Sequence, residues 1–324
     1  MLPTGTRGPK VVAFGGGHGL YATLSALRHV TGNLTAVVTV ADDGGSSGRL
    51  RSELGILPPG DLRMALSALC DDGEWGQLWR DVLQHRFKTD GPLNHHATGN
   101  LLIASLWNLL DDPNEGLDVV GRLLGVQGRV LPLSNSPMEI QADVVENGMT
   151  KVVRGQSRVA VAPGRVEHVR LFPVSAVVNP AVLEAIEEAD WCVFGPGSWY
   201  TSVVPHLMMP ELKEKLGSCN AQLLLALNLT NDVETSDMTH GDHLRSFVSY
   251  SGGITPRVVV ADPTAIDDLD ELDEAVGEYG VKLLLRQLHQ YGQTAVHDPL
   301  RFAAALRDAF EGTITDVAKE GPKN

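Results

Sequence analysis

The chain has 324 residues, of which 43% are hydrophobic, and its 40 acidic and 26 basic residues give a net charge of −14. This length is enough for one large domain or two small ones. A negative chain repels a nucleic-acid backbone, so we expect no nucleic-acid binding. No run reaches the roughly 18 apolar residues of a membrane span, and the N-terminus lacks the apolar core of a secretory signal. We therefore expect a cytoplasmic protein.

Apolar runs alternate with segments of helical period along most of the chain. Strands are predicted at 11–14 and 34–40, with a helix at 20–30 between them. Helices follow at 61–70, 74–87, 99–110 and 115–124, and Asp61 is the expected N-cap of the first of these. This alternation predicts the α/β class, with a Rossmann-like parallel sheet and helices on both of its faces.

The hydrophobic period changes to two between residues 139 and 173, with turn signals at Asn147-Gly148 and Pro163-Gly164. We predict a small antiparallel β insertion there, within a single domain that spans residues 1–324. The alternating pattern then resumes, with helices at 180–189, 240–250 and 299–310 and strands at 191–194, 222–227 and 257–260. The polar tail at 313–324 is expected to be flexible.

A glycine-rich turn follows the first strand and consists of Gly15, Gly16, Gly17, His18 and Gly19. Glycine leaves no side chain between backbone N–H groups and an anion, and the start of the next helix favours phosphate. His18 either donates to a phosphate oxygen or faces solvent. A tight turn without a ligand is the alternative. The segment also fits the loose dinucleotide pattern, which keeps NAD(P) binding open.

The second strand leads into an acidic segment that contains Asp42, Asp43, Gly44, Ser46 and Ser47. The two carboxylates have three possible uses: to accept hydrogen bonds from a ribose, to hold Mg²⁺ against a diphosphate, or to act as a base. An Asx turn or a helix cap is the structural alternative. The serines and the backbone around them resemble an anion-binding nest.

Further polar residues follow later strands or open a helix. These candidates are Asn100, Gly195, Pro196, Gly197, Ser198, Tyr200, Thr201 and Asn228. Residues 195–198 form a second glycine turn, and the three hydroxyls after it, those of Tyr200, Thr201 and Ser202, could contact a sugar or a base, although a plain turn is the alternative. Because the carboxyl ends of parallel strands share one edge of a sheet, we expect these loops to converge on one ligand.

In order along the chain, these segments resemble the YvcK/CofD-like family, and more closely its YvcK branch, the gluconeogenesis factors. The longest matching string is Val38–Arg51, which contains the acidic segment. Shorter matches are Gly15–Leu20, Pro58–Arg63, Gly99–Leu102 and the stretch from Gly195 to Ser202. The resemblance extends over roughly residues 11 to 300, so it covers nearly the whole chain.

This resemblance implies a Rossmann-like sheet with a nucleotide in its cleft. Proteins similar to this chain bind UDP-sugars such as UDP-N-acetylglucosamine, and they are linked to gluconeogenic growth, cell shape and peptidoglycan synthesis. No enzymatic activity is established for that branch. The CofD branch transfers a phospholactyl-type group from a GDP-linked donor to a deazaflavin, with Mg²⁺.

Two hypotheses of different classes follow. The first is a UDP-sugar-binding regulatory protein that needs no cofactor, forms a homodimer and signals to a protein partner. The second is a transferase in which Asp42 and Asp43 hold Mg²⁺; the sequence identifies no catalytic residue for it.

Overall fold

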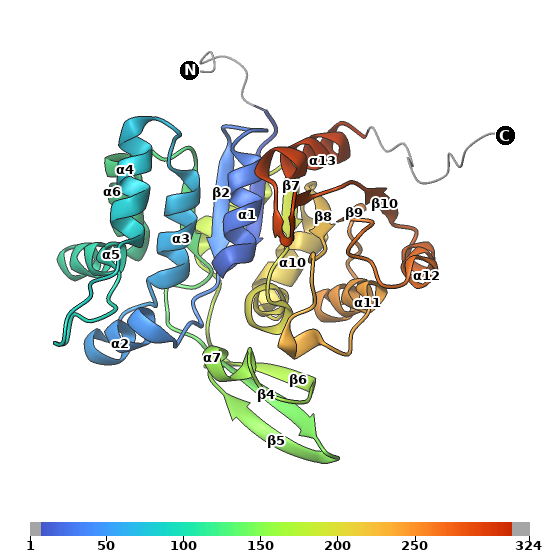
Figure 1. Cartoon of the computed structure of the whole chain (residues 1–324), viewed down its shortest axis with the longest axis horizontal. Coiled ribbons are helices and arrows are strands. Elements are labelled where there is room, and N and C mark those ends of the chain that lie inside the picture. Colours follow the sequence, from blue (N-terminus) through green and yellow to red (C-terminus); the bar gives the residue numbers. More distant parts are fainter. Residues whose placement is uncertain (1–7, 313–324) are drawn as a thin grey trace.

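The structure is a computed structural model that describes residues 8–312. At its centre is a seven-stranded sheet in which all neighbouring strands are parallel, in the order β10-β9-β8-β7-β1-β2-β3 (Figure 1). The strands are Val11–Gly15 (β1), Leu34–Val38 (β2), Arg129–Pro132 (β3), Trp191–Phe194 (β7), Gln222–Ala226 (β8), Val258–Ala261 (β9) and Lys282–Leu285 (β10). The tail predicted to be flexible lies outside the described residues.

Both faces of this sheet are buried, which explains why its strands are continuous apolar runs in the sequence. Along β1, Val11 and Ala13 belong to one hydrophobic cluster, whereas Val12 and Phe14 belong to another. None of these four side chains is more than 2% exposed. Successive residues of the strand therefore face two separate cores, one on each side of the sheet.

Helices form a layer on each face of the sheet (Figure 1). The layer on the side of Val11 contains α1 (Gly17–Leu27), α3 (Gly60–Leu69), α4 (Glu74–Gln84), α5 (Thr98–Leu109), α6 (Pro113–Leu124) and α13 (Pro299–Glu311). The opposite layer contains α8 (Pro180–Glu187), α9 (Val204–Leu207), α10 (Pro210–Ser218), α11 (His240–Ser251) and α12 (Leu269–Tyr279). The predicted Rossmann-like α/β architecture is confirmed.

The predicted antiparallel insertion is also present, as a three-stranded sheet that projects from the main body (Figure 1). Its strands β4 (Glu139–Glu146), β5 (Met149–Arg154) and β6 (Arg165–Phe172) pair in the order β5-β4-β6. Asn147 and Gly148 form the first turn with positive φ angles of 51° and 77°. The apolar run before Pro163 was predicted to be extended, but Gln156–Val159 forms the short helix α7, which buries Val159.

Several elements have no counterpart in the sequence prediction. Gly45–Leu54 forms helix α2 in the segment predicted to be a loop. The prediction also lacked two strands of the main sheet, β3 and β10, and two helices, α10 and α12. It lacked in addition a hairpin formed by β11 (His289–Gln290) and β12 (Gln293–His297). Glycine and serine are poor helix formers, so α2 owes its formation to burial of Ser46, Ser47 and Leu50 rather than to propensity. Among residues 8–312, no helix has the length and apolar character needed to cross a bilayer.

Candidate functional site

The two glycine turns lie at the point where the strand order reverses direction. From β1 the chain proceeds to β2 and β3 on one side of the sheet, and later from β7 to β10 on the other. Residues 15–19 follow β1, and residues 195–198 follow its neighbour β7. In open α/β sheets this switch point, at the carboxyl ends of the strands, is where ligands bind.

The two turns contact each other through their backbones. A Cβ placed on Gly19 would lie 2.2 Å from the carbonyl oxygen of Pro196 and 2.4 Å from Cα of Gly197. The Thr23 hydroxyl, on the second turn of α1, donates to the Gly195 carbonyl at 2.9 Å. Only glycine at position 19 permits this approach. The convergence of the two turns agrees with the sequence analysis, whereas a role in binding stays a prediction.

A cavity of about 650 Å³ opens where the turns meet, within the roughly 300–1,000 Å³ usual for small-molecule sites. We call it the glycine cavity. Of the predicted site residues, those that line it are Gly16, Gly17, His18, Gly19, Pro196, Gly197, Ser198 and Asn228. Ser202, Asp61, Asp232 and His297 also line it. No lysine or arginine is among the lining residues, so a bound anion would depend on backbone amides or on an added cation.

The first turn of α1 presents such amides. Gly16 is the N-cap residue, and no side chain caps the helix. A Cβ on Gly16 would come within 2.7 Å of both the Asp61 carboxylate and the Thr39 methyl group, and Gly17 has a φ of +54°. N–H groups at a helix N-terminus are a typical phosphate site, and here the Asp61 carboxylate lies beside them and accepts a hydrogen bond from the Gly17 backbone.

Asn228 fixes the second turn. Its Oδ1 accepts the Gly197 N–H at 2.7 Å, and its Nδ2 donates to the Gly197 carbonyl at 3.1 Å. Gly197 has a φ of +144°, a conformation in which other residues are strained. The predicted ligand residue Asn228 therefore lines the cavity, but the hydrogen bonds of its side chain are made to the turn.

Asp61 is a site residue that the sequence analysis misassigned. It was expected to cap α3, but that helix begins at Gly60, and Asp61 lies within its first turn. Its side chain instead reaches the glycine cavity, where Oδ2 is buried without a hydrogen-bond partner in the described chain. Burial, and then the neighbouring Asp42 carboxylate, raise the pKa of Asp61 to about 7. In the sequence, the resemblance of Pro58–Arg63 to the family was the signal that could have identified Asp61 as a site residue.

Asp42 and Asp43 point to different neighbours and do not line the glycine cavity. Asp42 Oδ1 accepts the Gly44 N–H at 2.8 Å, which makes an Asx turn before α2. Burial raises its pKa. Asp43 Oδ1 accepts the Ser157 N–H at 2.8 Å and so anchors helix α7 of the insertion. Both carboxylates therefore have backbone partners outside the cavity, and the Mg²⁺ ion assigned to them stays a prediction.

Ser46 and Asn100 belong to a buried polar network beside the cavity, and neither lines it. Asn100 Nδ2 and His96 Nδ1 both lie 3.0 Å from the Ser46 hydroxyl, and Arg63 Nε donates to Asn100 Oδ1 at 2.9 Å. Ser47 hydrogen-bonds to Asp42. This network connects α2 to α3 and α5. The side chains of Ser46 and Asn100, which were expected to face a ligand, form hydrogen bonds within it instead.

Tyr200 and Thr201 are buried, because residues 199–203 form a π-helix that turns both side chains inward. The Tyr200 hydroxyl donates to Met238 Sδ at 3.4 Å. The backbone N–H of Tyr200 donates to Glu234 Oε1 at 2.9 Å. Burial raises the pKa of Glu234 to about 7. The next hydroxyl, that of Ser202, is the one that lines the cavity.

The β11–β12 hairpin also lines the glycine cavity, and the sequence analysis did not predict this hairpin. Gln290, Ala295, Val296 and His297 line it. Burial lowers the pKa of His297 to about 4, so this ring is neutral at physiological pH. Short alternating segments with no strong turn motif carry little sequence signal.

The fold and the glycine cavity define a doubly wound α/β protein with paired glycine turns at its switch point. Residues 11–300 match the family model described as 2-phospho-L-lactate transferase CofD. The chain belongs to this CofD family, in its gluconeogenesis-factor (YvcK-type) group.

Individual relatives agree with this assignment. A "Putative gluconeogenesis factor" of Mycobacterium leprae is 44% identical over 307 residues, which cover 92% of this chain and 85% of that protein. The "Gluconeogenesis factor" of Bacillus subtilis is 35% identical over 294 residues, covering 90% and 91%. A crystal structure of a UPF0052 family member from Bacillus halodurans superposes with a TM-score of 0.83 at 34% identity, covering 93% of this chain and all of that one.

Proposed function

We propose that this chain is a cytoplasmic regulatory protein that binds a nucleotide-sugar of the UDP-N-acetylglucosamine type. The observation that carries the proposal is the backbone contact between residues 15–19 and 195–198 at the edge of a 650 Å³ cavity. The amides at the start of α1 bind the diphosphate, and Ser198 and Ser202 add hydroxyl donors.

A cation completes this proposed site. The cavity is lined by Asp61 and Asp232 but by no lysine or arginine. A diphosphate beside two carboxylates needs either Mg²⁺ or protonation of a carboxyl group to offset the repulsion. We assign the Mg²⁺ to the Asp61 carboxylate, which lines the cavity, and the raised pKa of Asp61 provides the protonated alternative.

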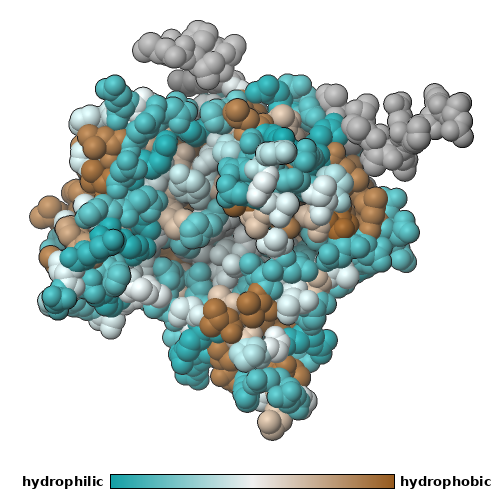
Figure 2. Space-filling view, in the orientation of Figure 1, coloured by the Kyte–Doolittle hydropathy of each residue, from teal (hydrophilic) through white to brown (hydrophobic). Residues whose placement is uncertain are grey.

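The proposed regulatory role concerns gluconeogenic growth, cell shape and peptidoglycan synthesis. The names of the relatives support the first of these. Bound ligand would be reported to a protein partner, and the insertion offers exposed apolar side chains for one, at Met149, Val152 and Val161. Figure 2 shows hydrophobic surface over this part of the molecule. The exposed Trp75 and Leu78 of α4 are a candidate homodimer surface.

Calorimetric titration tests the proposal directly. We expect saturable binding of UDP-N-acetylglucosamine, strengthened by Mg²⁺, and no competition from NADP, which represents the dinucleotide alternative. Absence of heat at millimolar ligand, with or without Mg²⁺, would contradict the proposal.

A transferase is the second candidate, and the Asp61 carboxylate at the cavity, whose pKa is raised by burial and then by the nearby Asp42 charge, favours it. In that case the protein with Mg²⁺ should release nucleotide steadily from a GDP- or UDP-linked donor. Asp61→Asn should abolish this release, whereas Asp43→Asn should leave most of it, because Asp43 is bonded to the insertion. Binding without turnover would favour the regulatory protein.

A further inference from the structure

A second pocket lies next to the glycine cavity. Its volume is about 590 Å³, and Leu229 and Thr230 line both spaces. The β11–β12 hairpin contributes to both as well: Gln290 and His297 line the glycine cavity, and His289 lines the second pocket. We call the second space the histidine pocket. A ligand held at the glycine turns could therefore extend past Leu229 into it.

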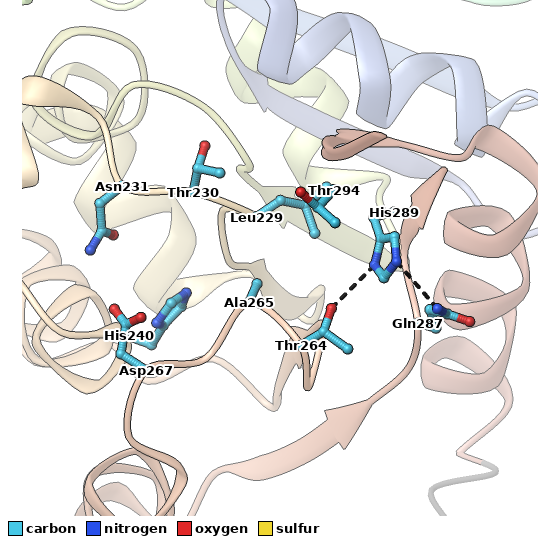
Figure 3. Close-up of a pocket in the computed structure, with 10 residues that line it drawn as sticks. All are labelled: Leu229, Thr230, Asn231, His240, Thr264, Ala265, Asp267, Gln287, His289 and Thr294. Carbon is cyan, nitrogen blue, oxygen red and sulfur yellow. Dashed lines mark hydrogen bonds between the residues drawn. The ribbon is translucent and has the colours of Figure 1, made fainter. Parts of the chain in front are cut away.

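The histidine pocket is polar but carries no lysine or arginine among its lining residues. Its lining consists of Leu229, Thr230, Asn231, His240, Thr264, Ala265, Asp267, Gln287, His289 and Thr294. Figure 3 shows Asn231, His240 and Asp267 on one side, His289 and Gln287 on the other, and Leu229 and Ala265 between them. Hydroxyls, amides and one carboxylate around a small apolar surface suit a neutral polyhydroxylated group, and they do not suit a phosphate.

One side of the pocket is held in a fixed orientation by Asp262. This buried carboxylate accepts the Leu288 N–H at 2.6 Å and His289 Nδ1 at 2.8 Å. Burial would raise the pKa of Asp262, but the hydrogen bonds from Leu288, Thr264 and His289 outweigh it and bring the pKa to about 2. Asp262 is therefore ionised at neutral pH, and its hydrogen bonds to Leu288 and His289 fix the orientation of the His289 ring.

The opposite ring nitrogen of His289 accepts from Gln287, because an amide nitrogen can only donate. Gln287 Nε2 lies 3.2 Å from His289 Nε2, and Figure 3 marks this hydrogen bond together with the one between His289 and Thr264. Gln287 is exposed, whereas His289 is 8% exposed. His289 therefore orients the exposed Gln287 amide, and the second N–H and the carbonyl oxygen of such an amide are well suited to hydrogen-bond a ligand hydroxyl.

The geometry points to the histidine pocket as the subsite for the sugar of the nucleotide-sugar. This inference rests on the proposed function and adds where the neutral, hydroxyl-rich end of the ligand is recognised. Gln287, oriented by His289, bonds its hydroxyls from one side and Asp267 from the other, while Leu229 and Ala265 contact its apolar face.

The test compares UDP-N-acetylglucosamine with UDP, which lacks the sugar. Both are titrated calorimetrically into the wild type, Gln287→Ala and Ala265→Trp, the last of which fills the pocket. Gln127→Ala is the matched control, because Gln127 is exposed and precedes β3 at the opposite edge of the sheet. We expect each pocket variant to weaken binding of UDP-N-acetylglucosamine by about tenfold and binding of UDP by less than about twofold.

The outcomes separate the subsite from the proposed function. If the wild type binds neither compound, the proposed function fails and the subsite fails with it. If it binds both, but the variants weaken both equally or neither, the proposed function stands and the subsite is overturned. Gln287→Ala removes only an exposed side chain, so it keeps the test decisive even if Ala265→Trp does not fold.

Discussion

Gly19 and Pro196 are 177 positions apart in the chain, yet the carbonyl oxygen of Pro196 occupies space that a side chain at position 19 would need. The approach of 2.2 Å to an ideal Cβ leaves no room even for alanine. The site therefore depends on two backbones in direct contact, one from each half of the sheet.

Gly19→Ala should separate the two turns. We expect a loss of about 1–3 kcal/mol in the free energy of unfolding, which is typical of overpacking, and at least about a tenfold loss of nucleotide-sugar affinity. Urea denaturation and calorimetry measure the two effects. Gly32→Ala is the control, since a Cβ there meets nothing within 4 Å. Equal behaviour of the two variants would show that the contact is unimportant.

Asn228→Ala should loosen the second turn without changing the first. It removes both hydrogen bonds to Gly197 and leaves the N–H and carbonyl of that residue without their partner. The expected cost is about 1–3 kcal/mol in unfolding free energy, with weaker ligand binding. Asn228→Asp keeps the acceptor for the Gly197 N–H but repels the carbonyl, so it should fall between wild type and Asn228→Ala. Full stability of the alanine variant would contradict this role.

Asp61 should make stability decrease as pH rises. The folded state keeps the proton up to a pKa of about 7, whereas the unfolded chain loses it near 3.8. Between these values the folded state binds more protons, so the unfolding free energy falls with rising pH. Asp61→Asn removes this dependence. Between about pH 5 and pH 8 the unfolding free energy of this variant should exceed that of the wild type by about 1 kcal/mol or more.

The measurement for Asp61 is a series of urea denaturations across that pH range. Glu234, whose pKa is also raised to about 7, contributes the same slope to both proteins and cancels in their difference. A difference that does not change with pH would show that the Asp61 carboxyl group titrates normally.

Asp43→Ala should destabilise helix α7 of the insertion and leave the glycine cavity unchanged. Its carboxylate accepts the Ser157 N–H at the start of α7, and losing such a bond typically costs about 1 kcal/mol. We expect faster amide hydrogen exchange at residues 156–160 and unchanged ligand affinity. Asp43→Asn keeps an oxygen acceptor and should show a smaller effect. A loss of affinity with normal exchange would instead place Asp43 at the ligand.

The strand-and-turn units were predictable because their signals are local. An apolar run followed by glycines identifies the end of a buried strand, and neighbouring parallel strands bring such ends together, as for residues 15–19 and 195–198. Side-chain direction was less predictable. Tyr200 and Thr201 face inward because of a π-helix, and Asn100 is used by a buried network with Ser46 and Arg63, both of which depend on distant contacts.

Other parts of the site could not be predicted from local patterns. Helix α2 forms despite two glycines and two serines in its first four residues, since tertiary burial outweighs propensity. Asp61 has the sequence context of a helix cap, and only the fold brings its carboxylate to the glycine turn. The β11–β12 hairpin is too short for its period to be recognised, yet it borders both cavities.

The adjacency of β1 and β7 has a consequence for the nascent chain. Residues 11–19 are synthesised long before residues 191–198, and the intervening segment includes the whole insertion. The first glycine turn consequently has no partner until the second half of the sheet has been made and has docked. Ligand recognition should thus appear late in biosynthesis, and a truncated product ending before Trp191 should be unable to compete for the ligand.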